Sequence, residues 1–72
     1  MYDYILTGER IRQKRIESKL TIETVAEKID RSVKYYGDIE RGSCGMSIST
    51  LIRISQTLNL STDYILYGKD YK

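Results

Sequence analysis

Serine and threonine residues divide this chain into short segments whose apolar residues recur at helical spacing, and the chain contains no proline. Because the side-chain oxygen of such a residue accepts a hydrogen bond from the first turn of a helix, each predicts a helix start. Gly42 and Gly68 are natural helix ends. We therefore expect an all-α fold with five helices: 8–19 after Thr7, 22–29 after Thr21, a third from Ser32 to Gly42, 48–58 after Ser47, and 62–67 after Ser61.

Two of these helices have a clear apolar face, and the apolar pattern of the first helix is weaker. At about 100° per residue, the apolar residues of helix 22–29 and of helix 48–58 each gather on one side. In the first helix, Ile11 and Ile16 are the main apolar residues and Arg15 projects between them, so this arginine needs a partner. The expected inner residues of the other two helices are Ile22, Val25, Ala26 and Ile29, and Ile48, Leu51, Ile52, Ile54 and Leu58.

The length of 72 residues is that of one domain, and we expect residues 1–72 to form it. A chain this short buries only about 60% of its unfolded surface, so it needs well-packed helices or association with another copy. The net charge of +2 is too small to identify a polyanionic partner. Residues 10–15 nevertheless contain four basic residues and no acid, which is a local basic run.

The composition excludes most catalytic and metal sites. With no histidine and only Cys44, the chain has no Ser-His or Cys-His pair and no zinc site of Cys and His ligands. A carboxylate-based hydrolase would need clustered acids, which the sequence lacks. We expect no enzyme activity, no metal and no cofactor.

The sequence also bears on the location of the protein in the cell. No apolar run reaches the roughly 18 residues of a membrane span, and no signal peptide is visible. A single cysteine suits a reducing compartment, so we expect a cytoplasmic protein.

The second and third helices are joined by only Asp30, Arg31 and the capping Ser32. Two short helices linked by such a turn form a helix-turn-helix, here at about residues 22–41. On the third helix, Tyr35, Tyr36, Ile39 and Glu40 occupy one side, and Val33, Lys34, Gly37, Asp38 and Arg41 the other. The second side mixes an apolar residue and a glycine with charges, which is unusual for a merely solvated face.

The stretch LTIETVAEKIDRSVKYYGDIERG, residues 20–42, resembles the helix-turn-helix of phage-repressor and Xre/Cro-type regulators. GERIRQKR before it and STLIRISQTLNLSTDYILYG after it extend the resemblance to residues 8–68. The resemblance implies a compact five-helix bundle of the lambda-repressor-like type, in which the third helix enters the major groove of double-stranded DNA. It also implies a bacterial or phage protein that regulates transcription as a repressor, bound as a homodimer to a dyad operator.

The DNA-facing positions of that family correspond here to Val33, Lys34 and Asp38, with Ser32 and Arg41 at the ends of the helix. Lys34 suits guanine or a phosphate, Val33 a thymine methyl group, and Asp38 the amino group of cytosine. Ser32 and Arg41 suit the DNA backbone. In the basic run, Arg12 and Lys14 are the better candidates for phosphate contacts, because Arg10 projects on the opposite side from Arg12; a solvated face is the alternative.

The family commonly joins the positions of Arg15 and Glu40 in an ion pair between the first and third helices. We therefore predict an Arg15–Glu40 salt bridge as a structural strut, with the two side chains no more than about 6 Å apart. The alternative is that Arg15 reaches a phosphate.

Several residues depart from the family pattern. Ile22 replaces the usual Gln, Asp30 the usual left-handed Gly, and Arg31 an apolar residue, while Tyr36 is large for its core position. Gly37 costs about 1 kcal/mol relative to Ala in a helix interior, and Asp38 brings a negative charge towards phosphates. These departures support an alternative function: a protein-interaction module that keeps the bundle and has exchanged DNA for a protein partner.

Seven tyrosines occur in the chain, several of them near its ends: Tyr2, Tyr4, Tyr64, Tyr67 and Tyr71. With Ile5, Leu6, Ile65 and Leu66 they make the terminal segments apolar. These residues either supply a homodimer surface on the last helix and the N-terminal arm or complete the small core of the monomer. Cys44 is interpreted as an incidental thiol.

Overall fold

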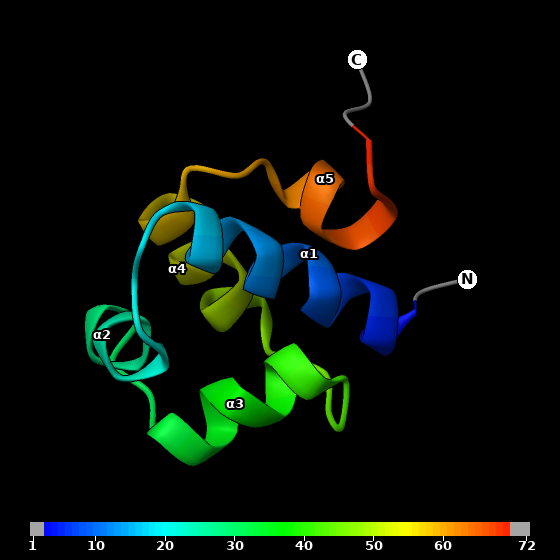
Figure 1. Ribbon diagram of the computed structural model, residues 1–72. Helices are drawn as coiled ribbons and strands as arrows, with labels where there is room; N and C mark the ends of the chain where they lie inside the picture. The colour runs from blue at the N-terminus through cyan, green and yellow to red at the C-terminus, as the bar shows by residue number, and fades with distance from the viewer. Residues whose placement is uncertain (1–2, 70–72) are drawn as a thin grey trace.

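The structure is a computed structural model that describes residues 3–69. It contains five α-helices in these residues and no strand: α1 (Tyr4–Glu17), α2 (Ile22–Lys28), α3 (Val33–Arg41), α4 (Ile48–Leu58) and α5 (Thr62–Tyr67). Helix α1 crosses the front of the molecule between α5 above and α3 below, with α4 behind it and α2 at one end (Figure 1). The predicted all-α class and number of helices are confirmed.

Every helix begins with a side-chain cap. Thr21, Ser32, Ser47 and Ser61 accept hydrogen bonds from the backbone N–H groups of Thr24, Tyr35, Thr50 and Tyr64, as the sequence predicted. These caps satisfy donors that have no partner within the helix.

The predicted start of the first helix is wrong. Asp3, and not Thr7, caps α1 by accepting from the N–H of Leu6 at 3.0 Å, so the helix starts a turn earlier than Gly8. Thr7 is instead 1% exposed inside α1. The physical reason is that Tyr4, Ile5 and Leu6 contain no helix breaker, and Asp caps at least as well as Thr.

Left-handed residues end the helices and make the tight turns. Gly42 and Gly68 adopt φ values of 76° and 81° at the ends of α3 and α5. Asp30 has φ 57°, the conformation expected where the family usually has glycine. Asn59 ends α4 in the same conformation at φ 56°. Asp and Asn tolerate this region better than most residues do.

The core consists of one apolar cluster to which all five helices contribute. Its fully buried members are Ile11, Val25, Ala26, Ile29, Tyr36, Ile39, Ile54, Leu58 and Ile65. Ile65 therefore belongs to the monomer core, in agreement with one of the two interpretations of the terminal segments. Tyr2 and Tyr71 lie outside the described residues.

Three predicted inner residues are exposed: Ile16 (44%), Ile48 (76%) and Ile52 (45%). Ile16 lies about 140° around α1 from Ile11, too far for both to face the core. The apolar arc of α4 covers about 160°, which is wider than the part of that helix that other helices cover. Periodicity identified the apolar side of α4 but not the fraction of it that is buried.

Helices α1 and α3 touch backbone to backbone at Gly8. A Cβ atom on Gly8 would lie 2.4 Å from the carbonyl oxygen of Ile39 and 2.5 Å from that of Glu40. Only glycine permits this approach. The contact places α3 against α1 and leaves the opposite side of α3 open.

Among residues 3–69, none of the helices has the length and apolar character that a membrane-spanning segment requires.

Candidate nucleic-acid interface

The orientation of α3 is set first by the ion pair between Arg15 and Glu40. The Nε of Arg15 donates to one carboxylate oxygen at 2.7 Å, and its Nη2 donates to the other at 3.1 Å. The side chains are only 11% and 3% exposed. The Nη1 of Arg15 also donates to the carbonyl of Leu20 at 2.8 Å. The predicted contact is therefore present, and the Arg15 side chain is held by α3 and by the turn that follows α1.

Tyr36 fills the space beside this ion pair. The side chain is fully buried, although it is large for its position in the family pattern. Burial, and then the nearby Glu40 carboxylate, raise the pKa of the Tyr36 phenol. Among the described residues, its hydroxyl group has no hydrogen-bond partner of normal geometry. Tyr36 therefore contributes to the fold by packing its ring in the core, and its hydroxyl group adds no hydrogen bond among the described residues.

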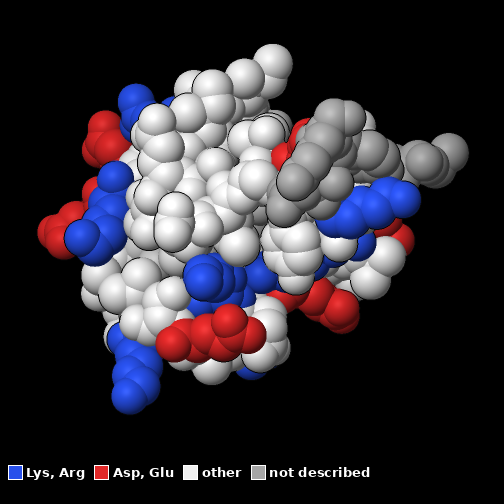
Figure 2. Space-filling view, turned by 90° about the horizontal axis from the view of Figure 1, so that it is seen from above, with Lys and Arg blue, Asp and Glu red and all other residues white. Residues whose placement is uncertain are grey.

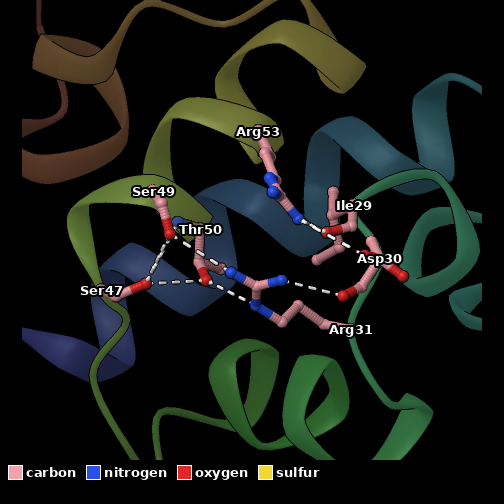
Figure 3. A network of polar contacts seen from close by, with 7 residues as sticks. All are labelled: Ile29, Asp30, Arg31, Ser47, Ser49, Thr50 and Arg53. Carbon is pink, nitrogen blue, oxygen red and sulfur yellow. Dashed lines mark hydrogen bonds and ion pairs between the residues drawn. The ribbon is translucent and has the colours of Figure 1, made fainter.

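The turn between α2 and α3 is attached to α4 by two arginines (Figure 3). Arg31 donates from Nε to the hydroxyl of Thr50 and from Nη2 to that of Ser49, both at 3.2 Å. Arg53, on α4, donates to the carbonyl of Ile29 at 3.0 Å. Arg31 therefore replaces the apolar contact usual at its position with hydrogen bonds to the start of α4. Ser47 joins the network by donating to Thr50 at 2.9 Å.

These contacts were not predicted from the sequence. The available signal was a serine and threonine cluster, Ser47, Ser49 and Thr50, together with an arginine at an otherwise apolar turn position. What pairs them is the packing of α2 against α4, which no local pattern reveals. The Arg31 network fixes the turn before α3 against α4, and the Arg15–Glu40 pair fixes α3 itself against α1.

The predicted outer side of α3 is exposed. Val33 is 47% exposed, and the side chains of Lys34 and Arg41 are 86% and 60% exposed. Ser32, at the start of the helix, is exposed while it caps the N–H of Tyr35. The apolar methyl groups of Val33, two cations and a hydroxyl are thus presented on one helix, which matches the chemistry of a major-groove surface.

Asp38 lies between the two cations. It accepts from the Nη2 of Arg41 at 2.6 Å and from the Nζ of Lys34 at 3.1 Å, and its side chain is 24% exposed. Arg41, and then Lys34, lower the pKa of the Asp38 carboxyl group. Spacings of three and four residues on a helix could have revealed both pairs from the sequence.

Gly37 is buried, although its side of the helix was expected to face outwards. The guanidinium group of Arg41 covers it: a Cβ atom on Gly37 would lie 3.0 Å from Nη1 of that arginine. The missing side chain therefore provides room for Arg41 to reach back to Asp38.

The basic residues of α1 do not share one surface. Arg12 is exposed and lies one helical turn before Arg15, on the side next to α3. Lys14 instead lines an open groove with Tyr64 and with Arg10, which donates to the carbonyl of Ile65 at 3.2 Å. Of the two residues expected to contact phosphates, only Arg12 lies on the α3 side of the helix.

Charge is distributed unevenly between the two halves of the chain. Between Gly42 and Gly68, only Arg53 and Asp63 are charged. Viewed from the α5 side, the molecule shows a broad area without Lys, Arg, Asp or Glu, with charged residues around its edge (Figure 2). Exposed apolar side chains of α4 and α5 include Ile48, Ile52, Tyr64 and Tyr67.

No group of three or more potential metal ligands occurs in residues 3–69.

Comparison with known proteins identifies the fold and the family. Residues 8–71 match a helix-turn-helix domain family. The chain is 38% identical over 58 residues to the HTH-type transcriptional regulator YobD of Bacillus subtilis, covering 81% of this chain and 52% of that protein. It is 39% identical over 59 residues to the immunity repressor protein of Bacillus phage phi105, covering 82% of this chain and 41% of that protein.

The structure also matches the P22 c2 repressor protein, solved in complex with synthetic operator 9T, with a TM-score of 0.86. The two are 30% identical, and the match covers 89% of this chain and 97% of that one. This chain spans about half the length of the relatives matched by sequence. The helix-turn-helix geometry, the operator-bound structural neighbour and the family match agree, and the chain belongs to the helix-turn-helix domain family.

Proposed function

We propose that this chain binds duplex DNA sequence-specifically, as a cytoplasmic repressor whose helix α3 enters the major groove. The observation that carries the proposal is the two-sided character of α3. Its inner side is held by Tyr36, Ile39 and the Arg15–Glu40 pair, while Val33, Lys34 and Arg41 are exposed on the other side. The likeness to a repressor solved with its operator supports this assignment over a protein-interaction module.

In this function, Lys34, Val33 and Asp38 contact bases. Ser32, Arg41 and Arg12 contact the DNA backbone. Lys14 stays a candidate for a phosphate contact, from the groove side of α1. The ion-pair role of Arg15 is favoured over a phosphate role, because each of its three guanidinium nitrogens donates to Glu40 or Leu20 and the side chain is only 11% exposed.

A homodimer is the second part of the proposal. The uncharged area on the α4 and α5 side offers a surface on which two copies meet without like-charge repulsion. The exposed apolar side chains of these two helices include Ile52 on α4 and Tyr67 on α5. In such a dimer, the two α3 helices lie about 34 Å apart, in successive major grooves on one side of the duplex.

The direct test is selection of a random duplex library with the purified protein. The proposal predicts recovery of an inverted repeat and an affinity for it that falls steeply with salt, because phosphate contacts release counterions. Lys34→Ala is expected to weaken operator binding and relax discrimination at one base pair without altering the circular dichroism spectrum. A library that shows no enrichment refutes the proposal and supports the protein-interaction module.

A further inference from the structure

We propose that Lys34, Asp38 and Arg41 act as a preformed unit that reads a C·G base pair, and that Asp38 is the specificity-determining residue of α3. This inference rests on the proposed DNA-binding function. It goes beyond that function because it assigns a base pair and a purpose to the negative charge on a DNA-facing helix.

The unit is already assembled in the free protein. Both oxygens of Asp38 are occupied, one by Lys34 Nζ at 3.1 Å and the other by Arg41 Nη2 at 2.6 Å. The two cations are 86% and 60% exposed, whereas Asp38 is 24% exposed. Two exposed cations therefore flank a carboxylate group that is less exposed than either of them.

The spacing within the unit matches the major-groove edge of one base pair. In a C·G pair, the cytosine N4 amino group and the guanine O6 atom are hydrogen-bonded to each other, at about 2.9 Å. The 3.1 Å separation of Asp38 and Lys34 allows the carboxylate to accept from N4 while the ammonium group donates to O6. Both contacts form with the ion pair intact, so binding does not require the pair to be broken.

An A·T pair offers a donor and an acceptor at the same two places, but its flanking groups are unfavourable. Beside the adenine amino group lies the N7 acceptor, which repels a carboxylate, and beside thymine O4 lies the C5 methyl group. In a C·G pair the guanine N7 lies beside O6 and is a second acceptor for the ammonium group. The unit therefore favours C·G in one orientation.

Asp38 also limits binding to other sequences. It neutralises one of the two cations that face the DNA, and so reduces the attraction of α3 to phosphates at every site. Gly37 makes this arrangement possible, because the Arg41 guanidinium group folds back over its backbone, 3.0 Å from where a Cβ atom would lie. Two departures from the family pattern, Gly37 and Asp38, thus have one explanation.

The test compares the full chain with Asp38→Asn, which keeps the shape of the side chain and removes its charge. Both proteins are used in the random-library selection, and their affinities for the recovered operator, for its C·G→A·T variant and for unrelated duplex are measured over a range of salt. For the unaltered chain we expect a C·G pair in each half-site and at least about tenfold weaker binding to the variant. Asp63→Asn is the matched control, since it makes the same change on α5, on the other side of the molecule from α3 (Figure 1).

For Asp38→Asn we expect the discrimination between the two operators to be lost and binding to unrelated duplex to become tighter. The salt dependence for unrelated duplex steepens by about 0.9 in the logarithmic slope for each additional phosphate that the variant neutralises. The inference is overturned, with the proposed function intact, when an operator is recovered and Asp38→Asn keeps the same base preference and the same affinity for unrelated duplex. If the unaltered chain enriches no sequence, the proposed function itself is refuted.

Discussion

Single residues explain why α3 has two different sides. Tyr36 and Glu40 belong to the buried side, where the carboxylate is satisfied by Arg15 and the phenol has no hydrogen-bond partner among the described residues. Asp38, two residues before Glu40, is an acid on the opposite side, and its partners are exposed cations. The same chemical group therefore serves as a strut at one position and as part of a surface at the other, because burial decides how strongly its partner is held.

At neutral pH, Tyr36→Phe is expected to leave the free energy of unfolding unchanged or to increase it by up to about 1 kcal/mol. The reason is that the variant removes a buried hydroxyl group without a partner. It should also remove a loss of stability in alkali. The pKa of Tyr36 is raised in the folded state. In the unfolded chain the phenol ionises near pH 10, so the contribution of this group to stability is complete below that pH and is lost as the pH rises further.

The measurement is the free energy of unfolding by urea between pH 7 and 11. Tyr64→Phe, at an exposed tyrosine on α5, is the control and should keep the alkaline loss. Equal loss in Tyr36→Phe and in the unaltered chain contradicts the expectation.

At the scale of the elements, two contacts hold α3 against α1: the close approach at Gly8 and the Arg15–Glu40 pair. The Arg31 network holds the preceding turn against α4. Helix α3 is thus fixed on its inner side and at its start, and within residues 3–69 no other helix covers the side that carries Lys34 and Arg41. Such support from rigid elements is what a binding helix needs to keep its side chains in register with a partner.

Glu40→Gln is expected to lower the free energy of unfolding by about 3–5 kcal/mol, because it leaves the guanidinium group of Arg15 nearly buried without a counter-charge. Replacing both partners, as Arg15→Met with Glu40→Met, should recover most of this loss, since an apolar pair leaves no charge unpaired. Urea denaturation of the unaltered chain and the two variants checks the order. If Glu40→Gln lowers the free energy of unfolding by less than about 1 kcal/mol, the pair contributes no more than an exposed salt bridge does, and the expectation is wrong.

Gly8→Ala and Gly37→Ala form a second matched comparison. A Cβ atom at Gly8 would strike backbone carbonyl groups at 2.4 and 2.5 Å, whereas at Gly37 it meets only the flexible end of Arg41, at 3.0 Å. We expect Gly8→Ala to destabilise by about 1–3 kcal/mol through overpacking. Gly37→Ala should stabilise by up to about 1 kcal/mol through helix propensity. Thermal unfolding measures both, and a shared sign of the two changes contradicts the assignment of the contacts.

At the scale of the whole molecule, charge and apolar surface are separated. Helix α3 carries charged residues on its outer side, whereas only Arg53 and Asp63 are charged between Gly42 and Gly68. Helices α3 and α5 lie on opposite sides of α1 (Figure 1). In the proposed function, the charged side of α3 meets DNA and the surface with little charge meets a second copy. Cyclic two-fold dimers use the same patch on both copies, and a patch with little charge is suited to facing itself.

Ile52→Lys is expected to dissociate the proposed dimer, because it places two like charges in the interface of a symmetric pair. Sedimentation equilibrium at micromolar concentrations measures the change in mass. Val33→Lys is the matched control: Val33 is 47% exposed and Ile52 45%, but Val33 lies on α3. A dimer that persists in Ile52→Lys, or is lost equally in Val33→Lys, argues against this surface.

The sequence alone determined the helices and much of their punctuation, because caps, left-handed turn residues and apolar periodicity depend on groups within a few residues of each other. Four caps and the inner side of α3 follow from such local rules, whereas the left-handed Asp30 was expected from the family pattern. The Arg15–Glu40 contact was predicted through the family resemblance, and the structure contains it.

Only the tertiary structure decided which parts of the apolar surfaces are covered and which distant groups meet. Ile16, Ile48 and Ile52 satisfy the helical pattern and remain exposed, since no other helix in residues 3–69 packs over them. The approach at Gly8 and the bonds from Arg31 to Ser49 and Thr50 require helices that are far apart in the chain to be placed in three dimensions. The ion pair between Arg41 and Asp38 joins residues three apart on one helix, yet it depends on the space that Gly37 leaves open.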